Sequence, residues 1–144
     1  MTVDPRAMLR EAALLERAGR LAEAEATYDR LLARWPDLPD SWYNLGLLQR
    51  RMGRFDAALA SYQQALDRGV AQPEEVHLNR GVIYADCLRQ DEAAERELNA
   101  ALALNPNYVP AFKHLTGKHP GVARYIRSFP QTAEFIQRIS DLLI

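Results

Sequence analysis

The residues of this chain that could carry out chemistry are few: three histidines, one cysteine and one Gly-Lys dipeptide. His114 and His119 lie five positions apart, but no cysteine or carboxylate stands near them at metal-ligand spacing. A reactive thiol needs a base or a positive environment, and Arg89 alone beside Cys87 is weak support for one. We therefore expect two solvated histidines, a structural cysteine and no metal site.

Residues 116–118 read Thr-Gly-Lys, the order found at the end of a phosphate-binding loop. That loop also needs a glycine five positions before Gly117, and Phe112 stands there instead. The sequence also lacks a dinucleotide-binding glycine motif, the paired histidines of a zinc protease and the nucleophile motif of hydrolases. We therefore expect a protein that is not an enzyme and has no cofactor.

The composition is that of one ordinary domain near neutral charge. The 144 residues include 18 Lys and Arg against 19 Asp and Glu, and 48% of them are hydrophobic. Residues 1–108 carry a net charge of −4 and residues 109–144 one of +3, so no strongly basic face for nucleic acid is expected. A single cysteine forms no internal disulfide, and no secretory leader or membrane span is visible. These features favour a cytoplasmic protein.

The elements that position these residues follow from an internal repeat. Residues 19–28 align with residues 53–62 at an offset of 34 positions, and in both a glycine ends one helical pattern as the next begins. A third copy is visible at residues 79–81, which align with residues 44–46 at an offset of 35. A repeat of this length predicts stacked helical hairpins.

The repeat resembles the tetratricopeptide repeat (TPR) family, over about residues 5–108 in units of about 5–38, 39–73 and 74–108. The resemblance implies an all-α fold, a right-handed TPR-type superhelical solenoid of helical hairpins. The residues of the second unit that carry it are Trp42, Leu45, Gly46, Ala58, Tyr62, Ala65 and Leu66.

Close packing between neighbouring helices explains the small and large positions of the repeat. Proline fits the first turn of a helix, so Pro5, Pro39 and Pro73 predict three helix starts. The small positions where helices approach are Ala12, Gly46 and Gly81 on the first helices and Ala24, Ala58 and Ala94 on the second. The large residues expected in the core are Tyr28, Trp42, Tyr62, Leu66, Leu98 and Leu102.

The third copy departs from the other two. His77 and Arg80 stand in place of the tryptophan and leucine, Leu88 replaces the glycine between the helices, and one extra residue lies between Gly81 and Pro106. We expect His77 to be a packing residue rather than a catalytic base.

The sequence after Pro106 leaves the repeat. Residues 108–115 begin like another first helix, and further helical patterns follow at residues 121–128 and after Pro130. We therefore expect a repeat array at residues 1–115 and non-repeat helices at residues 116–144 that pack on the array as a C-terminal cap.

The resemblance implies that the first helices line a concave groove in which ligands are held. The outward positions carried over by the repeat are Arg6, Leu9, Arg10, Ala13 and Arg17, then Asp40, Tyr43, Asn44, Leu47, Arg50 and Arg51, then Glu75, Leu78, Asn79, Val82 and Asp86. Lys113 and His114 would extend the groove. Some family members clamp a partner's C-terminal carboxylate, but Leu9, Ala13 and Glu75 stand where that clamp needs Lys, Asn and Lys.

Two features of this groove have alternative interpretations. Asn44 and Asn79 occupy the same repeat position and either pair with a peptide backbone or belong to the ordinary repeat consensus. The arginines either attract an acidic partner or form a solvated face paired with acidic neighbours. The arginines concerned are Arg10, Arg17, Arg50 and Arg51.

Three functions fit these observations. The leading prediction is a non-catalytic adaptor or scaffold that binds a peptide or partner helix in the groove. The second is the regulatory or substrate-presenting front of a larger enzyme, such as a sulfotransferase or glycosyltransferase. The third is a homodimer formed through the apolar face of the last helix, which carries Phe135, Ile136, Ile139 and Leu143.

Overall fold

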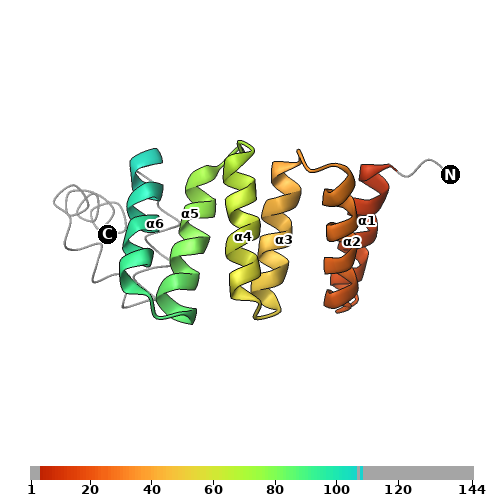
Figure 1. The fold of residues 1–144 in the computed structure, drawn as a ribbon, viewed down its shortest axis with the longest axis horizontal. Coiled ribbons are helices and arrows are strands. Elements are labelled where there is room, and N and C mark those ends of the chain that lie inside the picture. The colour runs from red at the N-terminus through yellow and green to blue at the C-terminus, as the bar shows by residue number, and fades with distance from the viewer. Residues whose placement is uncertain (1–3, 107, 109–144) are drawn as a thin grey trace, which may run out of the picture. The chain divides into compact units, whose positions relative to one another are not determined.

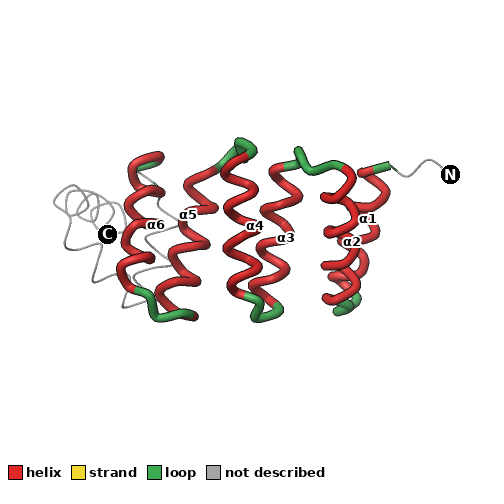
Figure 2. Tube along the Cα trace, viewed as in Figure 1, coloured by secondary structure: helices red, strands yellow, loops and turns green. Residues whose placement is uncertain are grey.

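The computed structural model of this protein describes residues 4–106 and residue 108, and every regular element among them is helical (Figures 1 and 2). The elements are α1 (Pro5–Arg17), α2 (Leu21–Arg34), α3 (Pro39–Arg51), α4 (Phe55–Asp67), α5 (Pro73–Val82), the π-helical turn η1 (Ile83–Cys87) and α6 (Asp91–Leu104). The all-α prediction is confirmed.

The helices pack in consecutive pairs, α1 with α2, α3 with α4 and α5 with α6. These are the three predicted hairpins. The chain divides into two compact units, residues 1–71 with the first two hairpins and residues 72–144 with the third. The predicted boundary near residue 115, the cap at residues 116–144 and the apolar face around Ile139 lie outside the described residues.

The helix starts follow the predicted proline positions. Pro5, Pro39 and Pro73 are each the first residue of a helix, where a missing N–H costs no hydrogen bond. Asp4 caps α1, because its Oδ1 accepts a hydrogen bond of 2.8 Å from the backbone N–H of Arg6.

The turns within the first two hairpins depend on glycine. Gly19 and Gly53 have φ values of +77° and +75°, in the left-handed region that glycine adopts without strain. The next residue in each turn then donates back to the helix that has ended. Arg20 N–H donates to Leu15 O, and Arg54 N–H donates to Gln49 O, both at 2.9 Å.

The turn of the third hairpin corrects the sequence alignment. Arg89, not Leu88, occupies the glycine position, because Arg89 has a φ of +56° and lies five residues before Ala94, as Gly53 lies five before Ala58. The extra residue of this copy is absorbed in η1, where Leu88 N–H donates to Ile83 O at 3.0 Å across a widened turn. An inserted residue therefore changes the helix geometry and leaves the hairpin intact.

The small repeat positions lie where predicted. Ala12, Ala24, Ala58 and Ala94 have no exposed surface, and both helical glycines are buried. A Cβ on Gly81 would lie 3.3 Å from Cγ of Leu98, so this glycine admits the close approach of α6.

The predicted large residues divide between full and partial burial. Tyr28, Tyr62 and Leu98 are buried as expected. Trp42, Leu66 and Leu102 are only partly buried, which corrects their prediction as core residues. Trp42 packs against the edge of the core, where its Nε1 donates a 2.7 Å hydrogen bond to the Pro36 carbonyl in the loop before α3.

A chain of polar side chains crosses the interior of the first unit. Gln49 of α3 donates to Oε2 of Glu25 at 3.0 Å and accepts from Oγ of Ser61 at 2.6 Å. Arg54, at the start of α4, forms an ion pair with the other carboxylate oxygen of Glu25. Glu25, Gln49 and Ser61 are all buried, so these bonds satisfy polar groups that would otherwise be costly.

Candidate functional site

The first helices of the first unit each have a buried and an exposed side. On α1, Met8 and Ala12 are buried, while Arg10, Ala13 and Arg17 are exposed at the helical spacing of one face. On α3, the residues turned inward are Ser41, Leu45, Gly46, Leu48 and Gln49. We call the exposed side of α1 and α3 the α1/α3 face, made of Arg6, Leu9, Arg10, Ala13, Glu16 and Arg17 with Asp40, Tyr43, Asn44, Leu47, Arg50 and Arg51.

A hollow of about 390 Å³ lies on this face between the two helices. Its lining residues are Ala13, Glu16 and Arg17 of α1 and Arg51 of α3. Arg17 and Arg51 occupy the same repeat position, 34 residues apart, so the hollow is a product of the repeat. Two predicted partner-binding residues are thereby brought together.

Glu16 links the two sides of the hollow. Its Oε2 lies 3.3 Å from Nη1 of Arg51, and its Oε1 accepts a hydrogen bond of 3.5 Å from the hydroxyl of Tyr28. Burial of Tyr28 and the negative charge of Glu16 raise the pKa of this tyrosine to about 12. Arg51 is therefore paired with an acidic neighbour, which is one of the two interpretations given above for the groove arginines. Glu16 is, however, the single carboxylate in a lining that contains two arginines.

The α3 part of the face carries an aromatic and an amide side chain. The ring of Tyr43 is partly exposed and lies 5.8 Å, centre to centre, from the ring of buried Tyr62. Asn44 is exposed, while Leu47 and Arg50 are partly exposed. The face therefore offers apolar contact next to groups that form hydrogen bonds.

The predicted partner-binding residues of the second unit are differently placed. Leu78 and Val82 are buried, at 9% and 3% exposure, and present little surface to a ligand. The Nδ2 of Asn79 donates to the carbonyl of Glu75 at 2.9 Å within its own helix. Lys113 and His114 lie outside the described residues. A role for these residues in partner binding stays a prediction.

His77 forms a polar contact that its sequence position did not indicate. Its Nδ1 lies 2.7 Å from Oε2 of Glu97, whose other oxygen lies 3.2 Å from Nη2 of Arg80. Histidine and arginine stand where the second repeat has tryptophan and leucine, and one carboxylate on the facing helix contacts both. His77 therefore joins α5 to α6 through Glu97.

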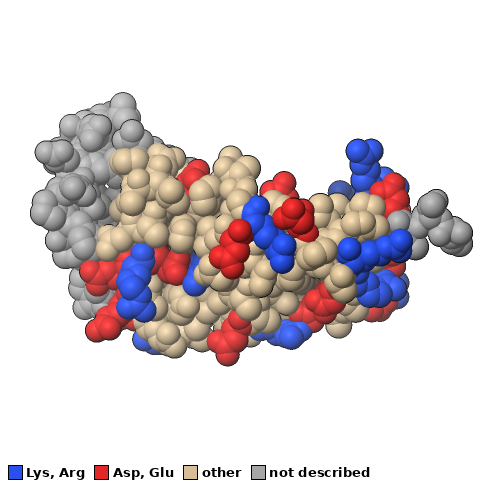
Figure 3. All heavy atoms as spheres, turned by 45° about the horizontal axis from the view of Figure 1, so that its top comes forward, with Lys and Arg blue, Asp and Glu red and all other residues tan. Residues whose placement is uncertain are grey.

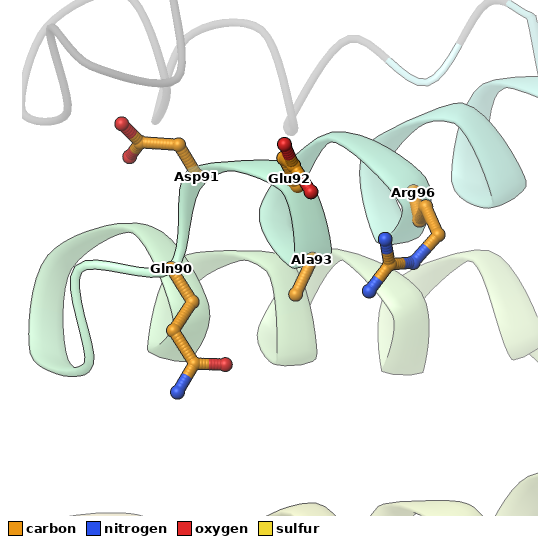
Figure 4. A pocket seen from close by; sticks show the side chains of 5 residues that line it. All are labelled: Gln90, Asp91, Glu92, Ala93 and Arg96. Atoms are coloured by element: carbon orange, nitrogen blue, oxygen red, sulfur yellow. The ribbon is translucent and has the colours of Figure 1, made fainter.

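The other candidates for chemistry do not converge. Within the described part of the chain, no three His, Cys, Asp or Glu side chains come together as metal ligands. Cys87, the last residue of η1, is an exposed free thiol. A hollow at the start of α6 is lined by side chains that point in different directions, as Figure 4 shows. Its lining residues are Gln90, Asp91, Glu92, Ala93 and Arg96.

The surface charge is mixed, and no described helix is long and apolar enough to cross a bilayer. Figure 3 shows acidic and basic side chains interspersed on one face of the chain, with basic side chains gathered over the N-terminal helices. In the described ranges, neither Arg10 nor Arg17 forms an ion pair.

Consecutive helical hairpins with small buried residues at their crossings define a class of helical repeat proteins. The chain belongs to the tetratricopeptide repeat family: two of that family's sequence profiles match residues 4–69 and 40–109. Members of this family bind protein or peptide partners, so the fold is in general that of a protein–protein interaction module.

Solved structures show the same fold at low sequence identity. YrrB, described as a TPR protein with an unusual peptide-binding site, is 21% identical with a TM-score of 0.66, over 92% of this chain and 69% of YrrB. A double mutant of MamA RS-1 is 18% identical with a TM-score of 0.69, over 94% and 76%. A TPR protein from Parabacteroides merdae is 22% identical with a TM-score of 0.68, over 90% and 54%.

Curated relatives match a much shorter part of the chain. A nucleotide-binding protein of Solibacter usitatus is 75% identical over 40 residues, which is 28% of this chain and 12% of the relative. One of Koribacter versatilis is 68% identical over 40 residues, or 28% and 13%. The match thus spans about an eighth of the length of each relative.

Proposed function

We propose that this chain is a non-catalytic interaction module that binds a peptide or a partner helix on the α1/α3 face of its first unit. The observation that carries the proposal is the hollow between α1 and α3, at which exposed side chains of two successive repeats meet. Exposed Asn44 next to partly exposed Tyr43 and Leu47 adds amide, aromatic and aliphatic contacts on the same face.

The chemistry of this face suits a polypeptide. An amide side chain both donates to and accepts from a peptide backbone, and an adjacent aromatic ring contacts apolar side chains. These groups lie on helices whose opposite sides are buried in one core, so they are held in place before a ligand arrives. The peptide-binding site named for YrrB is a property of that protein and adds support by analogy only.

Selection from a random peptide library tests the proposal. Short peptides displayed on phage are selected on the full chain, and their dissociation constants are measured for the original chain and for Asn44→Ala and Leu47→Ala. We expect each substitution to weaken binding about 3- to 30-fold, or about 0.7–2 kcal/mol. Asn99→Ala is the matched control, because Asn99 is an exposed amide on α6. If no peptide is recovered, or if Asn44→Ala and Leu47→Ala behave like Asn99→Ala, the proposal is wrong.

Nucleotide binding is the second candidate function. It is favoured by 75% identity to a nucleotide-binding protein, far above the identity to the solved TPR structures, although only 40 residues are matched. The absence of a phosphate-binding loop in the sequence argues against it. Calorimetric titration of the full chain with ATP and with GTP decides the matter, because heat that saturates at one site would support nucleotide binding.

A further inference from the structure

The charge of the hollow between α1 and α3 indicates the charge of the ligand that it would bind. Its lining contains two guanidinium groups, those of Arg17 and Arg51, and a single carboxylate, that of Glu16. Ala13 adds only a methyl group, so its side chain leaves room for an entering group. The lining therefore carries one net positive charge.

Glu16 holds Arg51 without using up its donors. The ion pair at 3.3 Å involves only Nη1 of a guanidinium group that has five N–H donors. The Tyr28 hydroxyl donates to the other oxygen of Glu16 and so helps to fix this carboxylate. Arg51 is thus oriented at the hollow and keeps donors for a second carboxylate.

Arg17 supplies the second cation. It is exposed, lies at the end of α1 and forms no ion pair with any described residue. Arg10 lies two turns earlier on the same face and likewise forms no ion pair there. Arg17 and Arg51 each stand two residues before the glycine of the turn, whereas the third repeat has Cys87 two residues before Arg89, so the basic pair belongs to the first two repeats.

We infer that the α1/α3 face selects an acidic segment of its protein partner, with one Asp or Glu side chain entering the hollow between Arg17 and Arg51. This inference rests on the function proposed above and specifies the chemistry of the partner. The carboxylate of Glu16 competes with the incoming acid for Arg51, so it weakens binding while keeping the arginine in position.

The peptides recovered by the library selection provide the first test. We expect Asp and Glu to be enriched among them relative to the starting library, and the enrichment to disappear when the selection is repeated on Arg17→Gln. Recovered peptides without acidic enrichment would overturn this inference and leave the proposed function standing. Recovery of no peptide would overturn both.

Affinity measurements with one recovered acidic peptide provide the second test. Arg17→Gln should weaken its binding about two- to fivefold, which is the range for one exposed ion pair. Glu16→Gln should strengthen binding about twofold or more, because it removes the competing charge. Arg30→Glu on α2 is the charge-altering control and should change affinity by less than about 1.5-fold, because the ion pair of Arg30 with Glu11 is long, at 3.8 Å, and exposed.

Two results would contradict the inference in this second test. One is weaker binding of the acidic peptide to Glu16→Gln while the variant unfolds at the same urea concentration as the original chain. The other is an unchanged affinity when the Debye length is reduced from about 10 Å to about 3 Å by added salt, since exposed charge pairs are screened under these conditions.

Discussion

The ring of Tyr62 lies directly over the backbone of Gly46. A Cβ placed on Gly46 would lie 2.5 Å from Cδ1 of that ring, closer than atoms approach in folded proteins. Tyr62 has no exposed surface and has little space into which to move. The glycine of α3 therefore sets how closely α4 packs, which is the physical basis of this repeat position.

Substitution of Gly46 by alanine should lower the free energy of unfolding by about 1–3 kcal/mol, because the added methyl group overpacks the helix crossing. Urea unfolding followed by circular dichroism measures the change. Gly81→Ala is the comparison, since its Cβ would meet the Leu98 side chain at a longer 3.3 Å. A smaller loss of unfolding free energy for Gly46→Ala than for Gly81→Ala would contradict the prediction that the Tyr62 ring excludes a side chain at position 46.

Arg89→Gly should stabilise the protein by about 1 kcal/mol. Arg89 has a φ of +56°, a left-handed conformation that costs a residue with a Cβ roughly 1–2 kcal/mol, and glycine adopts it freely. The control is Arg89→Ala, which removes the rest of the side chain but keeps the Cβ. Comparing the thermal unfolding of the two variants separates the relief of backbone strain from the loss of the arginine side chain. Equal melting temperatures for the two variants would contradict the prediction.

Gln49→Leu should destabilise the first unit by about 1–3 kcal/mol. The substitution keeps the size of the side chain but removes the partner of Ser61 and one partner of Glu25, both of which are buried. Gln63→Leu on α4 is the matched control, because Gln63 is exposed and its bond to Asp67 lies at the surface. The unfolding free energies of both variants are measured with urea. Equal losses in the two variants would contradict a stabilising role for the buried hydrogen bonds of Gln49.

Tyr28 should make the stability depend on pH under alkaline conditions. Its folded-state pKa, raised to about 12 from an ordinary value of 10.0 by burial and by Glu16, means that the folded protein keeps a proton that the unfolded chain loses. The stabilisation is therefore complete below pH 10.0 and is lost as the pH rises toward about 12. Urea unfolding across this pH range should show that the unfolding free energy falls more steeply with pH for the original chain than for Tyr28→Phe. Parallel curves would contradict the raised pKa.

The sequence predicted the fold because its signals are local and repeat. Pro39 at a helix start and Gly53 in a turn each act through their own backbone, so their positions fix the hairpin without knowledge of distant contacts. The same reasoning failed at Leu88, because an alignment without coordinates could not locate the extra residue. The widened turn η1 absorbed it before Arg89.

The candidate site was predicted only in part, for a related reason. Arg17 and Arg51 were identified from the repeat, and the structure brings both to one hollow. The pairing of Glu25 with Gln49, and of His77 with Glu97, joins residues from different helices, and neither pair has a spacing that sequence alone reveals. The burial of Leu78 depends on packing in the same way.

Mapping of a bound peptide by backbone amide chemical shifts tests the central claim most directly. The full chain, labelled with nitrogen-15, is titrated with a peptide recovered from the library. We expect the largest shift changes at exposed positions of the α1/α3 face, above all at Ala13, Arg17 and Asn44. Changes confined to the exposed positions of α2 and α4, or spread evenly over the chain, would contradict binding at this face.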